Sequence, residues 1–174
     1  MLSMAGHKTR LRGLVVLALM AFAVGACATR TTAAAHSRES VRSMVVTEAG
    51  RMGVPISLAL AVAHAESNYD AAAESPKGAR GVMQVMPATA TGEYGIHPDH
   101  LWDPRLNIRL GLHFLGRLLI RYKGRVDLAL SYYNGGSAVG DLPGARVIPA
   151  TFTYVLRVKK LQRHYRRQLS LGGI

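Results

Sequence analysis

An uncharged apolar run near the start of the chain decides which part of the sequence has to fold as a domain. Leu14 to Ala26 contains thirteen residues without charge, preceded by three basic residues and followed at once by the only cysteine, Cys27. A helix of this length reaches about 20 Å, which is shorter than the roughly 30 Å hydrocarbon core of a bilayer. A basic segment followed by such a run is typical of a secretory signal peptide. We therefore predict that residues 1–26 are a signal peptide and take no part in the fold.

The position of the single cysteine indicates how the mature chain begins. Cys27 comes directly after Val24-Gly25-Ala26, and this arrangement resembles the cleavage box of bacterial lipoproteins. The resemblance implies an exported protein held in the membrane by lipid on Cys27, with residues 27–38 as the acylated cysteine and a short tether. Since Ala28 rather than Asp directly follows the cysteine, the periplasmic face of the outer membrane is the expected location in a Gram-negative source. Cleavage without lipidation and an uncleaved anchor are the alternatives.

The remaining 148 residues carry 19 basic and 10 acidic side chains and are therefore strongly cationic. Export counts against nucleic acid as a partner. We therefore expect the positive charge to bind anionic lipid or the carboxylate-bearing cell wall. Much of it lies near the C-terminus, where Arg157 to Arg167 contains six Lys and Arg residues in eleven positions. This basic helix either contacts such a surface or is simply a solvated face.

We predict no cofactor and no metal, because there is no His-Glu-x-x-His motif and no cysteine pair. A monomer is favoured.

Helical spacing and capping residues predict a compact, mainly helical domain over residues 39–174. Each expected helix opens or closes at a Pro, Asp or Gly, and the segment 68–81 is rich in turn residues. No segment shows the alternation of a strand. The predicted helices cover residues 39–52, 55–67, 87–90, 103–124 and 127–133, with a last helix opening at Pro149.

One carboxyl group lies where charge is unexpected. Glu66 ends an apolar helix that runs uncharged from Ile56 to Ala65, except for the titratable His64. Partial burial raises the pKa of a carboxyl group, and the negative end of a helix dipole acts in the same direction. A carboxyl group that is protonated near neutral pH can act as a general acid. A solvated Glu at a helix end is the structural alternative.

Four short blocks, in a fixed order, resemble a known family. They are Glu66-Ser67-Asn68-Tyr69, the segment Ser75 to Ala90 with Gly81-Val82-Met83-Gln84 in it, Asp103 to Gly111, and Tyr133-Asn134-x-Gly136. Together they resemble the lytic transglycosylase domain of the soluble lytic transglycosylase family, whose short motifs are ES, GLMQ and AYN. The resemblance covers residues 41–158. Each block alone is a weak signal, but four in register are improbable by chance.

The resemblance implies a lysozyme-like, mainly helical fold and cleavage of the β-1,4 bond between N-acetylmuramic acid and N-acetylglucosamine in peptidoglycan. In this family the muramoyl 6-hydroxyl attacks its own anomeric carbon and leaves a 1,6-anhydro end, with Glu66 as general acid and then base. Glu66 has no acidic partner in the matched blocks, whereas hydrolysing glycosidases use two carboxyl groups. A non-catalytic peptidoglycan-binding lipoprotein and a hydrolysing lysozyme are the alternatives.

By the same resemblance, several polar and apolar residues are expected around the saccharide groove. Tyr133 would lie close to the acid and Met83 would form an apolar wall, although both could also be plain core residues. The substrate-binding set implied by the resemblance is Ser75, Met83, Gln84, Tyr133 and Asn134. The chain departs from the family at Ala150, where a Glu often precedes Thr and a later Tyr-Val pair. This difference places in doubt a supporting contact near the groove.

Overall fold

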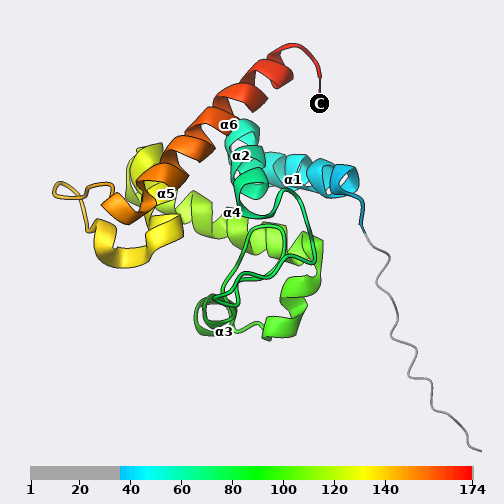
Figure 1. Cartoon of the computed structure of the whole chain (residues 1–174), viewed down its shortest axis with the longest axis horizontal. Helices are drawn as coiled ribbons and strands as arrows, with labels where there is room; N and C mark the ends of the chain where they lie inside the picture. Colours follow the sequence, from blue (N-terminus) through cyan, green and yellow to red (C-terminus); the bar gives the residue numbers. More distant parts are fainter. Residues whose placement is uncertain (1–35, 174) are drawn as a thin grey trace, which may run out of the picture. The chain divides into compact units, whose positions relative to one another are not determined.

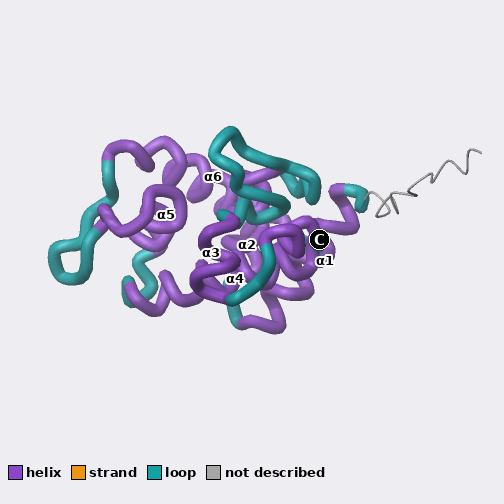
Figure 2. Tube along the Cα trace, turned by 90° about the horizontal axis from the view of Figure 1, so that it is seen from below, coloured by secondary structure: helices purple, strands orange, loops and turns teal. Residues whose placement is uncertain are grey.

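The computed structural model describes residues 36–173, so the predicted signal peptide and Cys27 lie outside the described residues. Within them the chain is helical, with three short 3₁₀ turns and no strand beyond isolated bridges (Figure 1, Figure 2). No helix among the described residues is long and apolar enough to cross a membrane. The elements, in order, are α1 (Arg38–Met52), α2 (Ile56–Ser67), α3 (Pro87–Tyr94), η1 (Pro98–Trp102), α4 (Pro104–Arg121), α5 (Val126–Gly135), η2 (Gly136–Val139), η3 (Pro149–Thr151) and α6 (Phe152–Ser170).

Helix α2 lies at the centre of the domain. All seven of its residues from Ser57 to Ala63 are buried, because α1 and α6 pack on either side of it (Figure 1). Gly53 ends α1 with a φ of 67°, a left-handed conformation that glycine adopts without steric cost. Asn68 and Tyr69 at the end of α2 are also left-handed, which turns the chain sharply after the helix. The apolar sequence before Glu66 is therefore a core helix.

Helix α4 is fixed at both its start and its side. Asp103 caps the helix by accepting a hydrogen bond of 2.7 Å from the Leu106 amide, as its sequence position predicts. On the side facing α1, the buried carboxylate of Glu48 accepts hydrogen bonds from Arg105 at 2.7 Å and Arg109 at 2.9 Å. These bonds, led by that of Arg109, hold the pKa of Glu48 below its ordinary value despite burial. The ion cluster therefore joins α1 to α4.

The predicted helices are confirmed, with shifted ends. The short helix expected at 87–90 extends to Tyr94, and the last helix begins as the 3₁₀ turn η3 before α6 starts at Phe152. The turns η1 and η2 were not predicted, because short 3₁₀ segments lack the repeating apolar pattern of longer helices.

The turn-rich segment between α2 and α3 is clamped to α4 by one buried side chain. Asn107 accepts from the Met83 amide at 2.8 Å and donates to the carbonyl oxygens of Arg80 at 2.8 Å and Leu101 at 3.0 Å. A Cβ on Gly81 would lie 2.6 Å from the Asn107 amide nitrogen, so only glycine permits this approach. The second and third sequence blocks thus form one structural unit.

Candidate active site

The proposed acid lies between two helices. Glu66 is in the last turn of α2, is partly buried, and accepts a hydrogen bond of 2.5 Å on Oε1 from the hydroxyl of Tyr154 in α6. Burial raises the pKa of Glu66 from 4.5 to about 7, while the Tyr154 bond and the positive charge of Arg157 partly oppose this rise. The carboxyl group is therefore divided between its acid and base forms near neutral pH.

Tyr154 is a site residue to which the sequence patterns gave no role. It belongs to the Tyr-Val pair noted beside Ala150, and Arg157 lies three positions later on the same side of α6. Burial, followed by the charge of Glu66, holds the pKa of the Tyr154 phenol well above its ordinary value, so the hydroxyl remains a donor. The Tyr-Val pair was the available signal, but only the packing of α6 against α2 shows that its tyrosine reaches Glu66.

Tyr133 lies near the acid but is bonded elsewhere. Its hydroxyl donates to the Met83 carbonyl at 2.8 Å. Burial raises the pKa of the Tyr133 phenol well above its ordinary value, and the charge of Glu66 adds to this rise. No hydrogen bond joins Tyr133 to Glu66 within residues 36–173. Tyr133 thus fastens α5 to the segment that precedes α3.

Met83 is a core residue and exposes no surface to a groove. Its side chain has no exposed surface, and a Cβ on Gly111 of α4 would lie only 2.4 Å from the Met83 Cβ. Its backbone is held on both sides, by Asn107 at the amide and by Tyr133 at the carbonyl. Met83 therefore acts on the site through its backbone, as part of the core.

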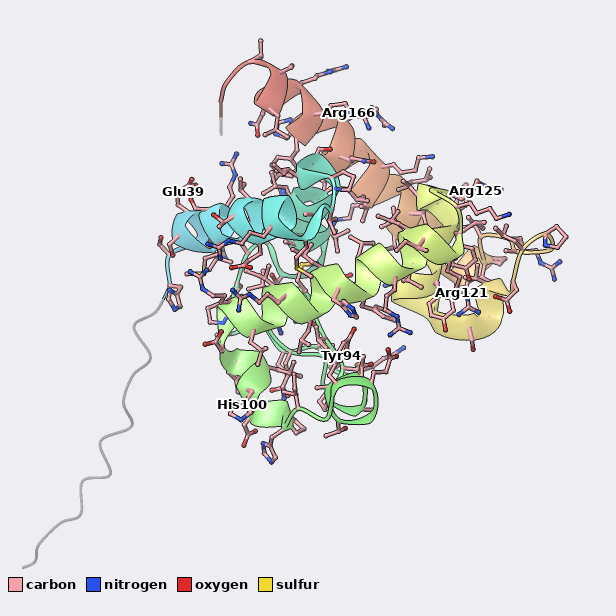
Figure 3. The ribbon with its side chains drawn as sticks, turned by 180° about the vertical axis from the view of Figure 1, so that it is seen from behind. Glu39, Tyr94, His100, Arg121, Arg125 and Arg166 are labelled. Atoms are coloured by element: carbon pink, nitrogen blue, oxygen red, sulfur yellow. The ribbon has the colours of Figure 1, made fainter. Side chains whose placement is uncertain are left out.

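Gln84 and Tyr133 line one pocket beside the site. Gln84 has a left-handed backbone with φ of 49°, and its side-chain amide donates to the carbonyl oxygens of Ala73 at 3.1 Å and Gly81 at 2.9 Å. These bonds fix the Gln84 side chain both to its own turn, through Gly81, and to the earlier loop at Ala73. The same pocket is also lined by Tyr94, labelled in Figure 3, at the end of α3.

The other two expected binding residues lie in local turns. Ser75 Oγ accepts from the Ala79 amide at 3.0 Å and closes its own loop. Asn134 is exposed near the end of α5. The departure from the family falls at Ala150, an exposed residue of the turn η3 that lies four positions before Tyr154.

No second carboxyl group acts on Glu66 among the described residues. Asp70 accepts from a nearby backbone amide, while Glu74 and Asp99 both pair with Arg80. No acid contributes to the shifted pKa of Glu66. Within residues 36–173, no group of three or more His, Cys, Asp or Glu side chains could hold a metal ion. The site thus offers one proton-transferring carboxyl group, held by a tyrosine.

Comparison with known proteins places this fold and sequence in a defined group. The family model described as Transglycosylase SLT domain matches residues 43–141. The chain is 33% identical over 90 residues to the soluble lytic murein transglycosylase of Escherichia coli K12, covering 48% of this chain and 14% of that protein. It is 34% identical over 109 residues to the membrane-bound lytic murein transglycosylase C of Edwardsiella ictaluri, covering 54% of this chain and 30% of that protein.

Solved structures agree with the sequence matches. An inactive glutamate-to-glutamine mutant of lytic transglycosylase Slt from Pseudomonas aeruginosa has a TM-score of 0.63 and 28% identity, covering 76% of this chain and 24% of that chain. The complex of the 70-kDa soluble lytic transglycosylase with bulgecin A has a TM-score of 0.62 and 25% identity, and the match covers 76% of this chain and 25% of that chain. These likenesses confirm the predicted mainly helical, lysozyme-like fold. The chain spans less than a third of the length of each of these relatives.

Proposed function

Because the chain belongs to the Transglycosylase SLT domain family, we propose that it is a lytic transglycosylase that cleaves peptidoglycan at the MurNAc-β-1,4-GlcNAc bond without water. The observation that carries this proposal is Glu66: a single carboxyl group whose pKa is raised to about 7 and which has no acidic partner acting on it within the described residues. The relatives named as lytic murein transglycosylases support the substrate class.

In the proposed reaction Glu66 acts twice. Its Oε1 accepts the Tyr154 bond, so the transferable proton is carried on Oε2. Glu66 donates this proton to the glycosidic oxygen as the C–O bond breaks, and the freed GlcNAc leaves with a new hydroxyl group. The carboxylate then takes the proton from the muramoyl 6-hydroxyl as that oxygen bonds to the anomeric carbon. The proton balance closes, and an intramolecular nucleophile removes the need to position water.

Tyr154 and Arg157 support the charged half of this cycle. Once Glu66 has lost its proton, the Tyr154 hydroxyl and the Arg157 charge both stabilise the carboxylate. Burial opposes them and keeps the pKa near 7, which suits a group that must give and then regain a proton. Tyr154 is thus assigned as a positioning residue for Glu66.

The groove residues keep the roles that their positions support. Gln84 and Tyr133 line the pocket beside the site and are assigned to saccharide binding. The Met83 carbonyl holds the Tyr133 hydroxyl in place, while Ser75 and Asn134 are proposed to shape a loop and a helix end of the groove.

Digestion of purified peptidoglycan, followed by chromatography and mass spectrometry, tests the function. We expect 1,6-anhydro ends, each one water lighter than the reducing ends that a hydrolysing lysozyme would release. The cleavage rate of the Glu66→Gln variant should fall by at least the roughly 10²–10⁴-fold that general acid–base catalysis typically contributes. A folded wild-type protein that binds the wall without cutting it would instead establish the non-catalytic alternative, which Ala150 at the usual Glu position favours.

The envelope is the proposed location, with a lipid on Cys27 as the anchor. The N-terminal pattern supports this, as does the membrane-bound relative from Edwardsiella ictaluri. The Cys27→Ser variant should lose acyl labelling in cells and leave the membrane fraction. Labelling that persists in this variant would refute the anchor. The basic helix α6 is proposed to meet an anionic surface of the envelope.

A further inference from the structure

The outward face of α6 combines exposed apolar side chains with exposed cations. Phe152 and Leu156 are 56% and 53% exposed, although large apolar side chains are usually covered. Lys160, Arg163 and Arg167 continue the same stripe at spacings of four, three and four residues, and all three are exposed. The core-facing side of α6 carries Val155, Val158 and Tyr165 instead. Within residues 36–173, the outward stripe, defined as Phe152, Leu156, Lys160, Arg163 and Arg167, therefore lies outside the hydrophobic cores.

The charge on this stripe is uncompensated. Within residues 36–173, none of its three cations takes part in an ion pair, whereas Arg105, Arg109, Arg117 and Arg121 on α4 all do. No acidic residue comes after Asp141 in the sequence. Figure 3 labels Arg166, a further exposed cation on the same helix. The helix thus presents a continuous cationic surface that begins with two apolar residues.

The described chain begins beside the C-terminal half of α6. Arg42 of α1 donates to Gln168 of α6 at 3.3 Å, and its guanidinium lies 5.8 Å from the centre of the Tyr165 ring. Nine peptide steps separate Cys27 from His36, a reach of at most about 30–33 Å. If Cys27 carries the proposed lipid, His36 stays within that distance of the bilayer surface, and the end of α6 lies next to the helix that begins just after it.

From these observations we propose that the outward stripe of α6 docks on an anionic phospholipid bilayer. Phe152 and Leu156 enter the interface between headgroups and acyl chains, and Lys160, Arg163 and Arg167 contact the headgroup phosphates. A helix with aromatic and aliphatic residues beside Lys and Arg is suited to lie in this interface. Lipid is favoured over wall polymer because a solvated polymer offers no apolar layer to cover Phe152 and Leu156.

This docking leaves the proposed catalytic site free. Two residues correspond to about 200° around a helix, so Tyr154 lies on the opposite side of α6 from Phe152. Tyr154 bonds to Glu66, which places the site on the far side of α6 from the proposed bilayer. A docked domain would therefore direct its site away from the membrane that holds it.

Vesicle binding across a salt series tests the proposal with the chain from residue 28 onward, which lacks Cys27. Helices α1 to α6 all lie within this chain and share its cores, so it is expected to fold without the signal peptide. We expect binding to vesicles of phosphatidylglycerol and phosphatidylcholine at 3:7, and weak binding to phosphatidylcholine alone. Each cation near such a surface contributes about fivefold, so the Lys160→Gln, Arg163→Gln, Arg167→Gln triple variant should bind about 100-fold less tightly.

The matched control removes the same charge elsewhere. Lys77, Lys123 and Arg146 are exposed outside α6, and replacing all three by Gln should change vesicle binding less than threefold. The Phe152→Ser, Leu156→Ser double variant should lose the binding that persists at high salt. Circular dichroism melting checks that every variant folds.

Three results would overturn the proposal. Equal losses in the two triple variants would mean that net charge alone attracts the protein. Unchanged high-salt binding of the double variant would exclude insertion of the apolar pair. Wild-type binding to purified wall sacculi but not to vesicles would make the wall the partner. Cleavage of soluble glycan fragments by the same variants reports separately on the proposed enzymatic function, which this docking does not require.

Discussion

Glu66→Gln should make the protein more stable at neutral and alkaline pH while abolishing its proposed activity. Burial raises the pKa of Glu66 from 4.5 to about 7, so the folded state holds the anion less well than the unfolded chain does. Below pH 4.5 the group is protonated in both states and contributes nothing. Between pH 4.5 and 7 the unfolded chain releases the proton first, which destabilises the fold by about 1.4 kcal/mol per pH unit. The penalty reaches about 3 kcal/mol above pH 7.

Glutamine removes this penalty without removing the bond at the site. Its side-chain oxygen can still accept the hydrogen bond that the Tyr154 hydroxyl donates to Glu66. The difference in unfolding free energy between variant and wild type should therefore be near zero at pH 4, grow between pH 4.5 and 7, and level off at up to about 3 kcal/mol. Titrations with urea, monitored by circular dichroism at several pH values, measure this difference directly.

Two comparisons make the result interpretable. Other titrating groups, including His64 whose pKa is lowered mainly by burial, are shared by both proteins and cancel in the difference. Glu39→Gln on the exposed start of α1 controls for the substitution itself and should change stability by no more than about 0.5 kcal/mol. A Glu66→Gln variant that is no more stable than wild type at pH 8, or a difference independent of pH, would refute the assigned desolvation of Glu66.

Three further predictions concern individual contacts in the fold. Tyr154→Phe removes the hydrogen bond that lowers the pKa of Glu66, so the pH above which the cleavage rate falls should become higher. An unchanged pH–rate profile would contradict this. Gly111→Ala should cost about 1–3 kcal/mol in urea unfolding because its Cβ meets a side-chain atom at 2.4 Å, whereas Gly116→Ala, with its nearest atom at 3.7 Å, should be neutral or stabilising. Glu48→Gln should lower the free energy of unfolding by about 1.5–3 kcal/mol at pH 7. This loss should shrink below pH 4.5, where the lowered pKa of Glu48 ceases to favour folding. A loss that is constant with pH would show a purely steric effect.

Local sequence signals were sufficient for most of the helices. The Asp103-Pro104 pair predicted the start of α4, and Gly53 and Gly124 predicted stops that the structure has within a few residues. These signals work because capping and helix breaking depend on atoms only a few residues apart. The 3₁₀ turns η1 and η2 escaped prediction, since four or five residues are too few to show a helical period.

Sequence alone also selected Glu66, since a charge at the end of an uncharged core helix is visible without any coordinates. It could not select Tyr154, which lies 88 positions away and reaches Glu66 only because α6 packs across α2. Nor could it decide whether Met83 forms a wall of the saccharide groove or belongs to the core, because its burial depends on the close approach of Gly111 in α4. Composition and spacing determine which residues can form helices and carry protons, because those properties are local. Which side chains meet is decided by the packing of helices distant in the sequence, and at Glu66 that packing supplies both the burial that raises its pKa and the hydroxyl that opposes the rise.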